Sequence, residues 1–164
     1  MATQNKNLSL FNKADIPFAK GMRIGIVVAN WNKEITSHLL DGVKETLLEC
    51  GASVSNISVI EVPGSFELVF GAKLMSKQKV DAIICLGSVI QGKTKHFDFV
   101  CNAVSSGIKD LNIALNVPVI FGVLTDNTLQ QARNRSGGKY GNKGVEAAIA
   151  AIRMACLNKE YNTF

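Results

Sequence analysis

Four short apolar runs, each followed by a segment with helical spacing, constrain the fold of this chain more than any other feature. The runs are rich in β-branched residues and cover residues 23–30, 57–62, 80–87 and 118–125. Short apolar runs of this kind predict parallel strands that are buried on both faces. Apolar residues at helical spacing predict helices over residues 34–50, 65–78, 97–115, 128–135 and 142–159.

This alternation of strands and helices predicts a parallel sheet that is covered by helices on both faces. Crossovers between parallel strands are right-handed, so the simplest solution is a flavodoxin-like, doubly wound α/β fold with a four-stranded parallel sheet. We assign residues 23–164 to this single domain and residues 1–22, which are mostly polar, to an N-terminal arm.

Composition and charge narrow the classes of function. The four cysteines form no Cys-x-x-Cys pair, and Cys85 and Cys156 lie in apolar segments, so we expect reduced core thiols and neither a zinc site nor disulfides. No secretory signal or apolar run of roughly 18 residues is present, which predicts a cytoplasmic protein without a membrane span. The net charge of +5 fits a solvated surface or an anionic ligand. Without a basic stripe interleaved with aromatic residues, nucleic acid is a poor candidate.

Polar, aromatic and glycine-rich residues gather where the four predicted strands end. In doubly wound sheets, ligands bind beyond the carboxyl ends of the strands. The sequence therefore predicts one composite site, which is built from residues 30–32, 62–67, 87–96 and 121–127.

One of these segments, GSVIQGKT at residues 87–94, matches the phosphate-binding loop of nucleotide hydrolases. Three features oppose that interpretation. The bulky pair Val89-Ile90 stands where small residues usually wrap phosphates. The nearest acidic candidate for a magnesium ligand, Asp126, lies outside its predicted strand, and His96 has no role in such a site. A nucleotide hydrolase is therefore our third hypothesis, but an anion site at this helix N-terminus is retained beside the alternative of a simple turn.

Five segments in order resemble the signature segments of the lumazine synthase family. They are NWNKEIT, VPGSFEL, GSVIQGKTKHFDFV, PVIFGVLTDNTLQQARNRSG and GNKGVEAA, and they span about residues 23–154. The resemblance implies condensation of 5-amino-6-(D-ribitylamino)uracil with 3,4-dihydroxy-2-butanone 4-phosphate. The products are 6,7-dimethyl-8-ribityllumazine, phosphate and water, in the penultimate step of riboflavin biosynthesis. It also implies that no metal and no organic cofactor is needed.

The resemblance also implies the residues that act on the phosphate substrate. His96 matches the proton-transfer histidine, and imidazole titrates in the range that such chemistry needs. Arg135 matches the phosphate-binding arginine, which we also expect to take part in catalysis, although a solvated helix end is the alternative. Gly92, Lys93 and Thr94 match the phosphate loop, and we expect Arg135 to meet this loop across a crevice at the strand ends. Lys93 departs from the small residue that is commoner there.

The pyrimidine and its ribityl chain are bound, by the same resemblance, by a second group of residues. Trp31 matches the aromatic residue that stacks on the ring, and Phe121 matches an aromatic residue from a neighbouring subunit, with a core position as its alternative. Lys143 and Glu146 match a pair near the site and could equally pack or form an ion pair. The complete set for this substrate is Trp31, Ser65, Phe66, Glu67, Val89, Ile90, Phe121 and Lys143.

Members of this family assemble into pentamers, and in some members twelve pentamers form a sixty-subunit icosahedral shell. The short segment 135–144 resembles that of shell-forming members, so we favour a shell. We expect the N-terminal arm to add an edge strand to a neighbouring subunit, and riboflavin synthase is a further candidate partner. Val69 and Gln91 also depart from the family pattern. The alternative function is a non-catalytic lumazine- or flavin-binding protein on the same scaffold, but such a carrier needs neither His96 nor Arg135.

Overall fold

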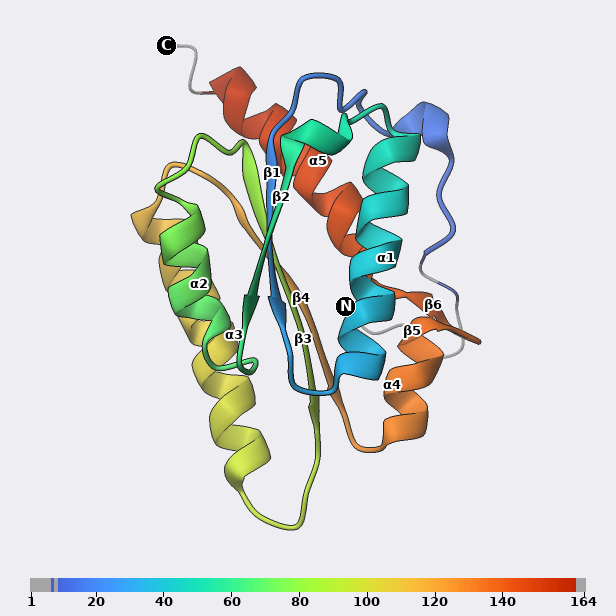
Figure 1. Ribbon diagram of the computed structural model, residues 1–164, viewed down its shortest axis with the longest axis vertical. Coiled ribbons are helices and arrows are strands. Elements are labelled where there is room, and N and C mark those ends of the chain that lie inside the picture. The colour runs from blue at the N-terminus through green and yellow to red at the C-terminus, as the bar shows by residue number, and fades with distance from the viewer. Residues whose placement is uncertain (1–6, 8, 162–164) are drawn as a thin grey trace.

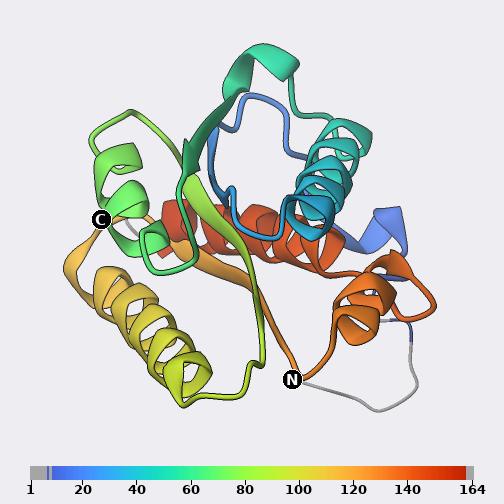
Figure 2. The ribbon, with the colours of Figure 1, turned by 60° about the horizontal axis from the view of Figure 1, so that its bottom comes forward.

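The computed structural model describes residue 7 and residues 9–161, and its centre is the predicted four-stranded parallel sheet. The strand order is β2-β1-β3-β4, and helices cover both faces (Figure 1). In Figure 2, α2 and α3 lie on one side of the sheet and α1 and α5 on the other. The flavodoxin-like fold class is confirmed.

The strands follow the predicted apolar runs closely except at one end. Their bounds are β1 Ile24–Ala29, β2 Ile57–Val62, β3 Ala82–Ile90 and β4 Val119–Asp126. Our prediction ended the third strand at residue 87, but β3 continues to Ile90, where it pairs with Asp126 of β4. Val89 and Ile90 have bulky side chains that suit an extended chain, so β3 continues through both residues.

The helices also match, except that α2 begins three residues later and ends three residues earlier than predicted. Their bounds are α1 Lys33–Glu49, α2 Leu68–Met75, α3 His96–Ala114, α4 Leu129–Arg135 and α5 Lys143–Tyr161, with short 3₁₀ turns η1 Lys13–Asp15 and η2 Val54–Asn56. We predicted that α2 begins at residue 65, but residues 65–67 form a turn, because Pro63 and Gly64 favour a turn after β2. The helix then begins at Leu68, whose N–H donates to the carbonyl of Ser65 at 3.2 Å.

A small antiparallel hairpin between α4 and α5 was absent from our prediction. It pairs β5 (Ser136–Gly138) with β6 (Gly141–Asn142). Gly137 and Gly141 have φ values of +116° and +84°, a conformation that only glycine adopts readily. The hairpin therefore depends on these two glycines.

The alternation of side chains along the strands divides the core into two layers. In β1, Ile26 and Val28 pack with α1, α4 and α5, whereas Val27 and Ala29 pack with α2 and α3. A large apolar side chain that is fully buried contributes roughly 1.5–3 kcal/mol, so both layers are needed for a stable sheet. These layers hold the strand ends in place beneath the loops.

The described part of the N-terminal arm packs against its own domain. Ile16 and Ala19 are buried, and Phe11 and Met22 pack beside them against the layer of α1 and α5. Residues 1–6 and 8 lie outside the described residues, and the other residues of the arm form no strand within this chain. The boundary after residue 22 and the strand added to a neighbour stay predictions.

The burial of the cysteines agrees in part with the sequence-based expectation of core thiols. Cys50 and Cys85 are buried, whereas Cys101 and Cys156 are half-buried, so Cys156 lies less deeply than we expected; all four are free. Burial raises the pKa of the Cys85 thiol to about 12, so it stays protonated and behaves as an apolar group. Within the described residues, no helix is long and apolar enough to span a membrane.

Candidate active site

A cleft of about 560 Å³ opens where β1, β2 and β3 end. It brings together the aromatic residue after β1, the turn after β2, the end of β3, the following loop and the first turns of α3. Its lining residues are Trp31, Gly64, Ser65, Phe66, Glu67, Ser88, Val89, Ile90, Gly92, Thr94, His96, Phe97 and Val100. The prediction of a composite site therefore holds for three of the four strand ends.

The position of Trp31 is fixed by the backbone around it. Its N–H donates to the carbonyl of Pro63 at 3.1 Å, which ties the end of β1 to the turn after β2. The next residue, Asn32, has a left-handed conformation with φ of 58°, which asparagine tolerates better than most residues. Its side-chain amide donates to the carbonyl of Ser88 at 2.9 Å. The indole is 72% exposed, so a flat aromatic face is available at the cleft.

The turn after β2 approaches β3 closely because Gly87 has no side chain. A Cβ at residue 87 would lie 2.6 Å from the hydroxyl oxygen of Ser65, which is closer than atoms can pack. Ser65 is buried, whereas Phe66 and Glu67 are exposed at the cleft. The turn thus presents a hydroxyl, an aromatic ring and a carboxylate next to one another.

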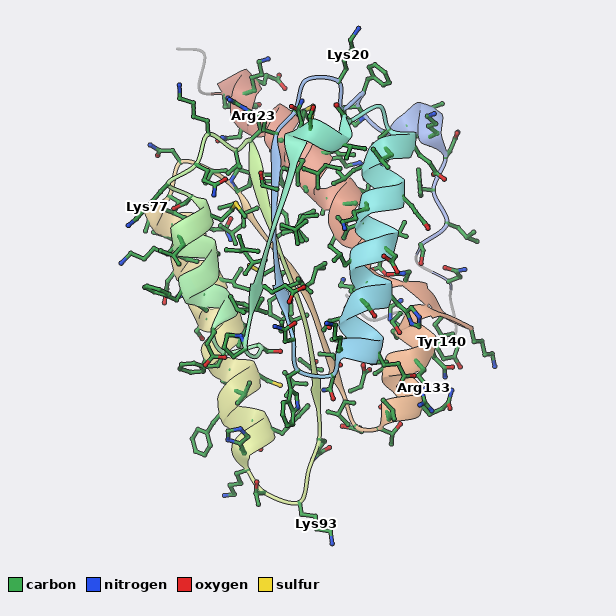
Figure 3. All side chains as sticks on the ribbon, viewed as in Figure 1. Lys20, Arg23, Lys77, Lys93, Arg133 and Tyr140 are labelled. Atoms are coloured by element: carbon green, nitrogen blue, oxygen red, sulfur yellow. The ribbon has the colours of Figure 1, made fainter. Side chains whose placement is uncertain are left out.

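The loop between β3 and α3 is open to solvent and ends at a helix N-terminus. Apart from the adjoining residues, no atom of the described part of the chain lies within 4 Å of the place that a Cβ on Gly92 would occupy. The hydroxyl of Thr94 accepts from the N–H of His96 at 3.4 Å. His96 is the first residue of α3, so unpaired N–H groups and the positive end of the helix dipole face this loop. Lys93 points away from the fold (Figure 3) and does not line the cleft.

The structure argues against a nucleotide-binding loop despite the matching motif. Residues 87–90 belong to β3 and pair with residues 123–126 of β4, so the chain there is extended and cannot wrap around phosphates. Only the last part of the motif, from Gln91 to Thr94, is a loop. Among residue 7 and residues 9–161, no group of three acidic, histidine or cysteine residues could hold a metal ion.

Comparison with known proteins identifies a family that the chain resembles over nearly its whole length. The family model described as 6,7-dimethyl-8-ribityllumazine synthase matches residues 21–159. Proteins of that name from Christiangramia forsetii and Flavobacterium johnsoniae are each 56% identical; the matches cover 98% of this chain and 96% and 85% of those proteins. A protein of the same name from Porphyromonas gingivalis is 50% identical over 97% of this chain and 99% of its own length.

The chain belongs to the 6,7-dimethyl-8-ribityllumazine synthase family. This is a family of enzymes, which favours catalysis over the non-catalytic carrier and the nucleotide hydrolase. Besides Lys93, three predicted site residues do not line the cleft, namely Phe121, Arg135 and Lys143.

Arg135 and Lys143 lie together in a cluster of charges apart from the cleft. The Arg135 guanidinium donates to Glu146 Oε1 at 2.8 Å and to the carbonyl of Tyr140 at 2.9 Å. Lys143 Nζ lies 3.1 Å from Glu146 Oε2. The side chains of Arg135 and Glu146 are only 20% and 16% exposed. Within one chain, Arg135 therefore does not meet the loop of Gly92–Thr94.

Phe121 is also placed away from the cleft of its own chain. It lies in β4, the edge strand, and packs half-buried against the layer of α2 and α3. The predicted core alternative therefore describes its position within the subunit. Its predicted contact with a neighbouring subunit's substrate stays a prediction.

The cleft contains residues that our sequence reasoning did not select. Ser88 is 1% exposed, lines the cleft, and its hydroxyl has no hydrogen-bond partner among the described residues. Phe97 and Val100 add an apolar wall from α3. Ser88 follows Gly87 directly in the strand-end segment, so its position could have been noticed. The only sequence signal for the apolar wall from α3 is the helical spacing of apolar residues after His96.

Proposed function

We propose that this chain condenses 5-amino-6-(D-ribitylamino)uracil with 3,4-dihydroxy-2-butanone 4-phosphate. The products are 6,7-dimethyl-8-ribityllumazine, phosphate and water, in the penultimate step of riboflavin biosynthesis, which we place in the cytoplasm. Family membership and the names of the relatives support this activity.

One observation carries the proposal: a single cleft contains a group suited to each part of the two substrates. Trp31 offers an aromatic face to a flat pyrimidine. Glu67 and Ser65 offer oxygen atoms to the hydroxyl groups of a ribityl chain. Thr94 and the start of α3 offer donors to a phosphate. His96 lies among them, and all of these residues line the same cleft.

The reaction then needs proton transfers at a fixed place. An amine attacks a carbonyl to form an imine and releases one water, phosphate is eliminated, and a second nitrogen closes the ring with loss of a second water. His96 starts α3 directly beside the loop that we propose for phosphate, and imidazole both accepts and donates protons near neutral pH. We assign it the proton transfers and the loop the orientation of the phosphate. The proposed chemistry uses no metal and no cofactor.

A neighbouring subunit completes the proposed site. Arg135, Lys143 and Phe121 lie outside the cleft of their own chain, so we propose that each subunit supplies them to the cleft of the next one in a pentamer. Large apolar side chains that are exposed on α2 and α3 support a partner at this face. They include Phe70 at 62% and Phe99 at 71% exposed. Assembly into a sixty-subunit shell and an association with riboflavin synthase are the finer parts of this proposal.

The proposed activity can be tested by turnover. Purified protein mixed with the two substrates should form 6,7-dimethyl-8-ribityllumazine, measured by its absorbance and fluorescence, and should release one phosphate for each product molecule. Added ATP with magnesium should neither be hydrolysed nor change the rate, because residues 87–90 are held in β3. If the protein binds the lumazine product but forms none, it is a carrier and the enzyme proposal is wrong.

The proposed assembly can be tested by replacing Phe70 with glutamate. This side chain lies on the exposed side of α2, and a charge there cannot be buried against a partner without a large cost. Light scattering should find pentamers or larger shells for the wild type and smaller species for the variant. The variant should lose activity with its assembly. Wild-type monomers with full activity would rule out a shared site.

A further inference from the structure

Asp126 lies between the phosphate loop and the charged cluster around Arg135. It is the last residue of β4, and its carbonyl accepts from the N–H of Gln91 at 2.9 Å, directly before Gly92. Side chains alternate along a strand, so Asp126 faces the same side as Leu124, which packs in the layer of α1, α4 and α5. The carboxyl therefore faces the side of the sheet that carries Arg135.

Asp126 is half-buried, and one oxygen of its carboxyl has no hydrogen bond to compensate its burial. Its Oδ2 atom is inaccessible to solvent and has no partner among the described residues. Burial raises the pKa of Asp126, and the nearby charge of Arg135 partly opposes this shift. Arg135 is thus close enough to act on Asp126 through its charge, yet its guanidinium is bound by Glu146 and the carbonyl of Tyr140.

Asp126 therefore does not hold the Arg135 guanidinium in place. It changes the electrostatic potential around that guanidinium. Glu146 pairs with two cations, Arg135 and Lys143, whereas Asp126 is influenced only by the charge of Arg135. Glu146 is paired through both of its oxygens and orients the two cations. The second carboxylate adds no such contact, and its negative charge opposes the attraction of Arg135 for any anion.

We propose that Asp126 is a tuning residue that weakens the hold of Arg135 on phosphate. This inference rests on the proposed function, in which phosphate enters as part of a substrate and leaves as a product. A site that bound free phosphate as tightly as its charges allow would release it slowly. Binding the product and the transition state equally tightly does not speed turnover. A half-buried carboxylate near the arginine limits this binding without removing any donor.

The test is to replace Asp126 with asparagine, which has the same shape and no charge. Inorganic phosphate should then bind more tightly, with an inhibition constant lower by roughly three- to tenfold, because one opposing charge near Arg135 is gone. The affinity for the ribitylamino-pyrimidine should stay within roughly twofold of the wild type, because this substrate is not held by the charge of Arg135. Calorimetry with inorganic phosphate and inhibition of turnover by phosphate measure the first effect, and calorimetry with the pyrimidine measures the second. Both are done at about pH 8, well above the usual range of a carboxyl pKa.

Two further variants control for a disturbed fold and for a general effect of charge. Asp126→Thr removes the same charge with a residue that suits a strand, so it should reproduce the result if asparagine disturbs the fold. Asp110→Asn removes an equal charge from the exposed end of α3, where Asp110 pairs with Lys109, and should leave phosphate binding unchanged. The folded-state pKa of Asp126 is raised, so its ionised form costs stability above that pKa and not below the unfolded value. Both Asp126 variants should therefore melt at or above the wild-type temperature near neutral pH.

Arg135→Ala separates failure of this inference from failure of the proposed function. If the wild type forms no lumazine, or if Arg135→Ala binds phosphate as well as the wild type does, the proposed site is wrong. If lumazine forms and Arg135→Ala weakens phosphate binding, but both Asp126 variants bind phosphate equally or more weakly than the wild type, the tuning role is wrong.

Discussion

Replacing His96 with alanine should slow lumazine formation by roughly 10²–10⁴-fold, the usual effect of removing a positioned acid-base group. His96 begins α3 and lines the cleft, and its backbone N–H is bonded to the hydroxyl of Thr94 beside it. Its imidazole is therefore held next to the loop that we propose for phosphate. Because amines and carbonyl compounds also condense slowly without an enzyme, we expect a residual rate and not a complete loss.

Steady-state and single-turnover rates with both substrates measure this effect. His38→Ala is the matched control, since His38 is the other histidine and lies on α1 among residues that do not line the cleft. The Michaelis constants of the His96 variant should change much less than its turnover number, because the binding groups remain. A His96 variant that works within a few-fold of the wild type would mean that the protons are transferred by another group.

The fold could be predicted because the periodicity of the sequence indicates which residues enter each of the two core layers. In β1, alternate residues such as Ile26 and Val27 enter different core layers, so the run is apolar throughout and predicts a strand that is buried on both faces. The helices need only one apolar stripe, and their spacing shows it. Burial thus fixes the elements and their type, which are the parts of the prediction that the structure confirms.

The ends of elements were harder because they depend on partners that lie far away in the sequence. β3 continues to Ile90, which pairs with Asp126 of β4. The apolar sequence of residues 80–87 does not indicate this register. The start of α2 at Leu68 depends on the turn that Gly87 accommodates from another strand. The hairpin of β5 and β6 is too short for periodicity and depends on two glycines with positive φ. The first two of these errors therefore involve tertiary contacts in addition to local preference, whereas the third involves glycines whose conformation no periodic pattern shows.

The candidate site shows the same division between local and distant information. Strand-end reasoning correctly brought Trp31, Glu67 and His96 together, because the carboxyl ends of parallel strands meet at one edge. It could not tell which face of the sheet each loop reaches. The cleft opens beside α3, whereas Arg135 ends α4, which packs in the layer of α1 and α5 on the other face. This position is the reason that we propose a role for Arg135 in the cleft of a neighbouring subunit.

Arg135→Ala should weaken the use of the phosphate substrate most among the binding variants. A charged hydrogen bond contributes about 1.5–3 kcal/mol, so the loss of one such bond to phosphate should lower kcat/KM for this substrate by roughly 10- to 100-fold. The Michaelis constant for the ribitylamino-pyrimidine should change much less, because Trp31 and Glu67 remain in the cleft. Arg135→Lys keeps the charge but loses the planar pair of donors, so it should recover only part of the loss.

Arg133→Ala is the matched control for this prediction. Arg133 lies on the same helix, but it is about half exposed and pairs with Glu34 on α1 at 2.7 Å, so its loss should leave both substrates unaffected. Without Arg135, Glu146 still pairs with Lys143, which limits the cost of an unpaired carboxylate and should preserve the assembly. Each substrate is titrated against the variants, and light scattering gives their size. Equal losses for both substrates, or dissociation into monomers, would mean that Arg135 stabilises the subunit through Glu146 and Tyr140 and does not bind phosphate.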